Sequence, residues 1–162
     1  KQLEIELGPA AKGSIWKLPS EKILARSTSQ DINENLVEER GRVLERALAA
    51  HGVETRLVGM VVGPTVTRYE LELGEGVKVS RVTSLNKDIA YAMASADVRI
   101  LAPIPGRQAI GIEVPNNERQ IVALGDVLSS VEAKRATHPL DVGVGRDING
   151  KSIVMNLSLI HI

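Results

Sequence analysis

The chain has 162 residues, of which 43% are hydrophobic and 25% charged, a balance that excludes a disordered or membrane-spanning protein and indicates a folded globular one. Its 20 basic and 20 acidic side chains cancel, so the chain lacks the overall positive field that draws many proteins to nucleic acid, although a local basic face is compatible with these numbers. There is no cysteine and the histidines His51, His138 and His161 are scattered, so we predict no disulfide and no metal site.

Residues 1–30 contain glycine and proline and have no sustained periodicity, so we predict a linker with one hydrophobic anchor near Trp16. The clearest helix follows and stops at Gly52. Asp31-Ile-Asn-Glu34 fits a capping box at its start. Apolar side chains then share one helix face, namely those of Leu36, Val37, Val43, Leu44, Ala47 and Leu48.

Two adjacent segments, Val53–Val62 and Val66–Leu73, alternate in residue type on either side of a Gly63-Pro64 turn. This pattern predicts two neighbouring antiparallel strands. In the second strand, one face contains Thr67, Tyr69, Leu71 and Leu73, whereas the other contains Arg68, Glu70 and Glu72. We interpret the charged face as solvated, with a channel or subunit contact through Arg68 as the alternative.

A second helix is predicted after Ser80, which is a suitable N-cap, and its apolar face contains Val82, Leu85, Ile89 and Met93. Val98–Leu101 and Ala109–Val114 predict a further strand pair, joined through prolines and a glycine. A short helix near Val122–Leu128 is expected to close this unit.

The predicted order of helix, two strands, helix, two strands and short helix indicates an α+β domain, with helices on a small, mostly antiparallel sheet, over residues 31–130. Residues 131–138 are then a boundary. Residues 139–157 are expected to form a β-hairpin that begins an incomplete second domain, and residues 158–162 are expected to be a non-native end.

The segment Gly145–Ser152 matches every letter of the phosphate-loop pattern G-x-x-x-x-G-K-S. In a phosphate loop, Lys151 would contact the nucleotide phosphates and Ser152 would bind magnesium. A phosphate loop also needs a helix whose first amide groups point at the anion. Here a β-branched, strand-like run follows, and Asn149-Gly150 is typical of a tight hairpin turn. We therefore interpret the segment as a hairpin and reject nucleotide binding.

Several long blocks of this sequence resemble the FtsK/SpoIIIE family of DNA translocases. They are Trp16-Lys-Leu-Pro-Ser20, Gly63-Pro-Thr-Val-Thr-Arg-Tyr-Glu-Leu71, Gly76-Val-Lys-Val-Ser-Arg-Val-Thr-Ser-Leu-Asn-Lys-Asp-Ile-Ala90, Val98-Arg-Ile-Leu-Ala-Pro-Ile-Pro-Gly106, Gly111-Ile-Glu-Val-Pro-Asn116, and Pro139-Leu140 leading into Gly145-Arg-Asp-Ile-Asn-Gly150. The resemblance covers Trp16 to about Leu157, and the sequence departs from the family pattern at about Asn156 or Ser158.

The resemblance implies a parent protein that pumps double-stranded DNA through a homo-hexameric ring, driven by ATP with magnesium, during chromosome segregation at division or sporulation septa. It implies that residues 31–130 are the α subdomain and that residues 139–157 begin the RecA-like motor β subdomain. This part of the protein would be cytoplasmic and would supply ring and channel surface without the ATPase site. Membrane anchoring would depend on segments outside the chain.

Lys78, Arg81 and Lys87 flank the N-terminal half of the predicted second helix, where they could contact phosphates of a duplex weakly and without sequence preference. A merely solvated surface is the alternative. The three aromatic residues are too few to stack single-stranded bases. No catalytic residue and no small-molecule substrate are predicted. Two other classes stay open, a small nucleotide-binding enzyme that uses Gly145–Ser152 and a protein-interaction domain without a DNA role.

Overall fold

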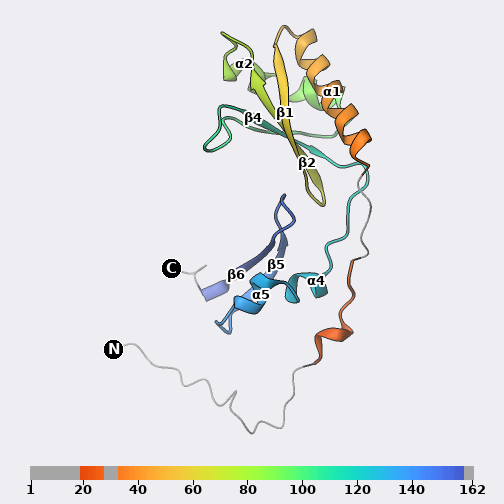
Figure 1. Cartoon of the computed structure of the whole chain (residues 1–162), viewed down its shortest axis with the longest axis vertical. Coiled ribbons are helices and arrows are strands. Elements are labelled where there is room, and N and C mark those ends of the chain that lie inside the picture. The colour runs from red at the N-terminus through yellow and green to blue at the C-terminus, as the bar shows by residue number, and fades with distance from the viewer. Residues whose placement is uncertain (1–18, 28–32, 159–162) are drawn as a thin grey trace, which may run out of the picture.

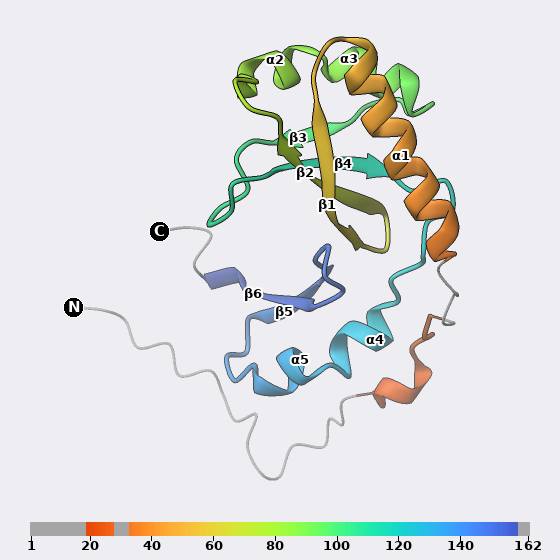
Figure 2. The same ribbon diagram turned by 45° about the horizontal axis from the view of Figure 1, so that its top comes forward.

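The computed structural model describes residues 19–27 and 33–158, so the predicted anchor at Trp16 and the predicted cap Asp31 lie outside the described residues. One group of elements is a four-stranded sheet with helices packed on it, and a second group is a two-stranded hairpin with short helices (Figures 1 and 2). The elements are η1 Glu21–Ile23, α1 Glu34–Ala50, β1 Thr55–Val62, β2 Val66–Leu73, α2 Val79–Ser84, α3 Asn86–Ala92, β3 Arg99–Leu101, β4 Ile110–Pro115, α4 Leu124–Leu128, α5 Val131–Arg135, β5 Asp141–Arg146 and β6 Ser152–Asn156. Among the described residues, no helix combines the length and apolar character needed to cross a membrane.

The larger sheet has the strand order β1-β2-β4-β3, and every neighbouring pair is antiparallel. This confirms the α+β class and the predicted order of helix and strand pairs. The predicted second helix is divided at Leu85 into α2 and α3. Its predicted cap was wrong, because the N-cap position is Lys78, with no side-chain capping bond, and Ser80 lies inside α2.

Helix α1 begins at Glu34, where the side chain of Asn33, two residues after the predicted cap, accepts a hydrogen bond from the Leu36 amide. The helix ends before Gly52, whose φ of +69° favours glycine. It lies close to the sheet at Gly41, where an added Cβ would be 2.7 Å from Cδ2 of Leu57. From there onward the predicted apolar face is well packed, whereas Leu36, on the first turns, is 49% exposed.

The hydrophobic core lies between the sheet and helices α1, α2 and α3. It includes the predicted apolar face of the second helix and the predicted inner face of β2. Its most deeply buried side chains are Leu44, Leu48, Val53, Tyr69, Leu71, Val82, Ile89, Ile110, Ile112 and Val114.

The two edges of this sheet are blocked or short. At the β1 edge, the carboxylate of Glu45 on α1 accepts a hydrogen bond from the Leu57 amide at 2.6 Å. The register of β1 also shifts between Leu57 and Gly59, which is a β-bulge. At the opposite edge, β3 spans only Arg99–Leu101. Charged partners, bulges and short strands all hinder pairing with another strand.

The turn between β1 and β2 is a point of contact between the two groups of elements. Asn116, just after β4, donates from Nδ2 to the Gly63 carbonyl at 2.8 Å and accepts from the Thr67 hydroxyl at 2.7 Å. On the other side, a Cβ on Gly63 would lie 3.0 Å from the carbonyl oxygen of Ile148 at the hairpin tip. The tip points toward this turn in both views (Figures 1 and 2). A glycine at 63 therefore leaves room for the hairpin.

The smaller group is built on the antiparallel hairpin of β5 and β6, which confirms the hairpin predicted for this region. Helix α4 packs against β5, because a Cβ on Gly143 would lie 2.8 Å from Cγ1 of Val127. It also contacts the N-terminal segment, where a Cβ on Gly125 would lie 2.6 Å from the Ala25 carbonyl oxygen. The expectation that this helix closes the sheet unit was therefore wrong. Helix α5 occupies part of the predicted boundary at 131–138.

Replacing Ser27 by alanine should raise the pKa of Asp126 toward its ordinary value of 3.8. In the wild type the Ser27 hydroxyl donates to Asp126 Oδ2, and the Ser27 amide donates to the same oxygen at 2.9 Å. These bonds favour the carboxylate and lower its pKa. The lowered pKa of Asp126 stabilises the folded state at pH values above the ordinary carboxyl pKa. This stabilisation is lost as the pH falls through the folded-state pKa. An NMR titration of the carboxyl carbons measures the change.

The control for this titration is Ser84→Ala, which removes a hydroxyl bonded to the Arg81 carbonyl and no carboxylate contact. It should leave the Asp126 pKa unchanged. An Asp126 pKa that stays equally low in Ser27→Ala would show that the hydroxyl bond is not its main cause.

Candidate nucleic-acid interface

The three basic residues nominated for phosphate contact are all exposed, but the structure does not bring all of them together. Lys78 and Arg81 are separated by one helical turn at the start of α2. Lys87 lies on α3, beyond the break at Leu85. Because residues three apart on a helix are neighbours, Lys78 and Arg81 lie on the same side of α2.

Lys78 and Arg81 line an open hollow of about 610 Å³ formed by the β2–α2 connection and α2, and Lys87 is not among its lining residues. Ser80 and Ser84 add hydroxyl groups to the wall, and Glu75 adds one negative charge. The hollow therefore has a net positive lining with hydroxyl donors. Cationic and hydroxyl side chains of this kind contact phosphate oxygens without reading base sequence.

Arg81 is held in place from the end of α1. Its Nη2 donates to the carbonyl oxygen of His51 at 3.2 Å, and a Cβ on Gly52 would lie 3.1 Å from the same nitrogen. The bond satisfies one of the last carbonyl groups of α1, as basic side chains often do at a helix C-terminus. Within residues 19–27 and 33–158, neither Lys78 nor Arg81 forms an ion pair. Their charge is thus free for an external anion.

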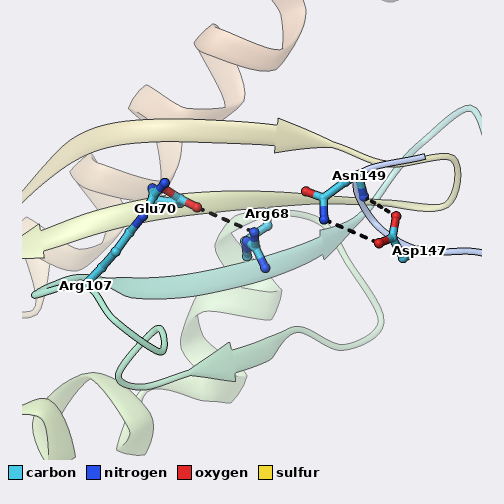
Figure 3. Close-up of polar contacts among 5 residues, drawn as sticks. All are labelled: Arg68, Glu70, Arg107, Asp147 and Asn149. Atoms are coloured by element: carbon cyan, nitrogen blue, oxygen red, sulfur yellow. Dashed lines mark hydrogen bonds and ion pairs between the residues drawn. The ribbon is translucent and has the colours of Figure 1, made fainter. Parts of the chain in front are cut away.

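The Gly145–Ser152 segment has the backbone geometry of a hairpin turn. Asp147 Oδ1 accepts hydrogen bonds from the amides of Asn149 at 2.9 Å and Lys151 at 2.8 Å. Figure 3 shows the Asp147 carboxylate beside Asn149 at the tip. Strand β6 begins at Ser152, where a phosphate loop would begin a helix. The amides that would bind a phosphate are therefore bound to a carboxylate of the same loop.

Two charged side chains that the sequence pattern placed in solvent, Arg68 and Glu70, are largely buried on the sheet face opposite the hydrophobic core. The side chain of Glu70 is only 5% exposed, and Arg68 Nη2 lies 3.6 Å from its Oε1. Arg107, from the β3–β4 connection, forms an ion pair with the other Glu70 oxygen (Figure 3). The Nε of Arg68 is buried and has no hydrogen-bond partner in the described part of the chain. The interpretation of this face as solvated was therefore wrong for Arg68 and Glu70.

Glycines on both neighbouring strands explain this burial. Gly59 pairs with Glu70 on one side and Gly111 on the other. A Cβ on Gly59 would lie 3.1 Å from Glu70 Oε2, and a Cβ on Gly111 would lie 3.0 Å from Cδ of Arg68. The absent side chains leave space in which the long charged groups lie along the sheet. Each glycine was visible in the sequence, but its position opposite Glu70 depends on the strand register.

Comparison with known proteins identifies similar sequences over most of the chain. The family described as FtsK alpha domain matches residues 18–116. A protein named DNA translocase FtsK from Mycobacterium tuberculosis is 55% identical over 106 residues, which is 65% of this chain and 13% of the relative. Its namesake from Tropheryma whipplei is 52% identical over 115 residues, or 71% of this chain and 15% of the relative.

The match to the DNA translocase FtsK of Sporosarcina ureae extends further, with 40% identity over 154 residues. It includes 94% of this chain and 20% of that relative. The chain thus spans between about an eighth and a fifth of the length of these relatives.

Proposed function

The chain belongs to the FtsK family, and from this premise we propose that it is part of an ATP-driven translocase of double-stranded DNA that acts in chromosome segregation. In this proposal residues 31–130 supply ring-assembly and DNA-channel surface, and residues 139–157 begin the motor β subdomain. The parent protein is a homo-hexamer anchored in the membrane at the septum by segments outside this chain. The names of the similar proteins and the α-domain match support this proposal.

ATP and magnesium belong, in this proposal, to other parts of the parent protein. The described residues do not fit these groups, since the one phosphate-loop pattern, Gly145–Ser152, directs its amides at Asp147. Its negative carboxylate would repel a phosphate at the place where the pattern requires one. The chain therefore contributes surface rather than hydrolytic chemistry.

The observation that supports a DNA contact most directly is the hollow lined by Lys78 and Arg81. Both cations are exposed, share one helix side and are unpaired within the described residues. Two such groups provide few phosphate contacts, so duplex binding by the chain alone should be weak, with a dissociation constant of about 10⁻⁴ M. Contact through phosphates alone makes the binding independent of base sequence.

Replacing both Lys78 and Arg81 by alanine should weaken duplex binding by roughly 10- to 100-fold at about 0.1 M salt, because two phosphate contacts are lost. The slope of log K against log salt should become shallower by about 2, since each contact contributes about 0.9. Fluorescence anisotropy with a labelled duplex at several salt concentrations measures both changes. Two duplexes of unrelated sequence should give the same result.

Lys151→Ala is the matched control, because it removes an exposed lysine that lies on the hairpin and outside the hollow. Lys151→Ala should leave duplex binding unchanged. A separate variant, Lys87→Ala, shows whether α3 also contributes to duplex binding. Circular dichroism of the double variant checks that loss of the Arg81 bond to His51 leaves the fold intact. Equal binding by the double variant and the wild type would refute the hollow as the DNA contact and favour a protein-interaction role.

A further inference from the structure

The tip of the hairpin carries a reactive pair of residues that the function proposed above does not use. Asn149-Gly150 is the only place in the sequence where glycine follows asparagine, and the other asparagines precede larger residues. Both residues are exposed to water. Asparagine side-chain amides are among the chemically labile groups of proteins. A following glycine makes the amide more reactive, because the glycine nitrogen has no neighbouring side chain to hinder its approach.

The reaction open to this pair is deamidation. The Gly150 nitrogen attacks Cγ of Asn149, so that a new N–Cγ bond forms, the Cγ–Nδ2 bond breaks and ammonia leaves with the proton of the Gly150 amide. Water then opens the resulting cyclic imide. Cleavage of the new N–Cγ bond leaves an aspartate, whereas cleavage of the original peptide bond leaves an isoaspartate, in which the main chain runs through the former side chain. Water is the only co-reactant.

The hairpin turn restrains the attacking nitrogen. Gly150 donates its amide proton to the Asp147 carbonyl oxygen at 3.0 Å, and the Asp147 amide donates to the Lys151 carbonyl oxygen at 2.8 Å. Asp147 Oδ1 also accepts the amides of Asn149 at 2.9 Å and Lys151 at 2.8 Å, which fixes the backbone on both sides of Gly150. The attack requires the Gly150 nitrogen to lose its proton and to turn toward Cγ of Asn149. It therefore proceeds when the turn opens locally.

The side chain of Asn149 is restrained much less than the backbone. Its Nδ2 lies 3.5 Å from Oδ2 of Asp147, and the two side chains lie next to each other at the tip (Figure 3). This distance is long for a hydrogen bond, and Asn149 is exposed, so the contact is weak. The backbone bonds to Asp147 are therefore the main barrier to the reaction.

We propose that Asn149 is a site of spontaneous deamidation and that Asp147 sets its rate by holding the turn closed. The modification changes the turn, because its product carries a carboxylate where Nδ2 lay near Oδ2 of Asp147. Like charges at this separation repel each other. Isoaspartate also adds a carbon atom to the main chain, which the hydrogen-bond spacing of a tight turn does not accommodate.

The same tip contacts the turn between β1 and β2, so the modification also affects the contact between the two groups of elements. Ile148 precedes Asn149, and its carbonyl oxygen would lie 3.0 Å from a Cβ on Gly63. A tip opened by the added charge and the longer main chain loses the shape that fits against this glycine. Because the release of ammonia is irreversible, the loosened form accumulates with the age of the chain.

The test follows conversion of Asn149 by mass spectrometry of peptides cut from the full chain after incubation at mildly alkaline pH, which favours loss of the Gly150 amide proton. A synthetic peptide of residues 144–153 gives the rate without the folded turn. Asp147→Ala removes the acceptor of two amide bonds, so it should raise the rate in the full chain roughly 10- to 100-fold, toward that of the peptide. Asp147→Asn keeps an acceptor oxygen at the same place, and its rate should stay close to that of the wild type.

Two controls separate the turn from general effects. Asn117 is an internal one, because it is exposed but precedes Glu118 instead of glycine, and it should stay unmodified in the same samples. Asp141→Ala removes a carboxylate of the same hairpin that accepts the His138 amide at 2.9 Å, and it should leave the rate at Asn149 unchanged.

The structural effect is measured on wild-type chain converted at Asn149, in which the amide NMR shift of Gly63 should differ from that of the unconverted chain. A wild-type rate equal to that of the peptide, or no conversion at Asn149 in either, would overturn the proposal. So would an unchanged rate in Asp147→Ala, or a rate in Asp147→Asn as high as in Asp147→Ala, which would assign the effect to charge instead of hydrogen bonds. An unchanged Gly63 shift after conversion would overturn the loosening of the contact.

Discussion

Replacing Glu70 by alanine should lower the free energy of unfolding by about 3–5 kcal/mol. The Glu70 side chain is 5% exposed and neutralises Arg68, whose own side chain is 17% exposed. Removing the carboxylate leaves the Arg68 guanidinium in a poorly hydrated position, with a buried nitrogen that already has no partner in the described residues. Urea denaturation followed by circular dichroism measures the loss.

A second variant separates the loss of the pair from the loss of packing. Changing Arg68 and Glu70 together to leucine should recover much of the stability, because replacing a buried ion pair by apolar residues is often neutral or better. Glu72→Ala is the control on the same strand face. The ion pair of Glu72 with Arg56 is largely exposed, so its loss should lower the free energy of unfolding by no more than about 1 kcal/mol. A cost for Glu70→Ala as small as that of Glu72→Ala would contradict the buried pair.

Replacing Leu44 by alanine should cost about 2–5 kcal/mol, because it removes a fully buried side chain from the centre of the contact between α1 and the sheet. The surrounding strands are fixed by hydrogen bonds and cannot collapse fully into the cavity. The loss should appear as a lower urea midpoint with an unchanged denaturant slope.

Leu36→Ala, on the same helix and with the same chemical change, is the matched control for Leu44→Ala. Leu36 is 49% exposed, so its truncation should change the free energy of unfolding by less than about 1 kcal/mol. Equal losses for the two variants would mean that the first turns of α1 pack as tightly as the rest of the helix.

The sequence predicted the elements well where a single periodicity decides the structure. The alternation around Tyr69 and Leu71 was enough to predict the inner face of β2, and the helical spacing of Leu44 and Leu48 predicted the buried face of α1. These predictions rest on local geometry. Every second residue of a strand lies on the same face, and so does every third or fourth residue of a helix. They were confirmed because the hydrophobic core reinforces both patterns.

Features that depend on contacts between distant segments were not predictable in this way. The same alternation placed Glu70 in solvent, because it contains no information about the glycines on the adjacent strands. Helix α4 was placed with the sheet, since its packing on β5 is a contact between elements that no local pattern specifies. At the candidate site, the sequence placed Lys78, Arg81 and Lys87 around the N-terminal half of one helix, but the helix break at Leu85 separates Lys87 from the other two.

In the hairpin, the sequence motif and the backbone geometry indicate different structures. Gly145–Ser152 satisfies a nucleotide-binding pattern, yet the residue at its third position, Asp147, turns the segment into a tight hairpin by accepting the amides itself. The strand-like residues after Ser152 were sufficient to predict this outcome.

The blocked edges of the larger sheet limit how copies of this domain can be arranged next to one another. A continuous sheet running from one copy to the next would need two open strand edges, but Glu45 occupies the amide of Leu57 on β1 and the opposite strand is only Arg99–Leu101. Extension of this sheet from one copy to the next is therefore disfavoured, and contacts between neighbouring copies are expected through side chains on their faces. Such contacts leave each copy free to tilt against its neighbours without breaking a backbone ladder, and they protect isolated copies from fibrous aggregation.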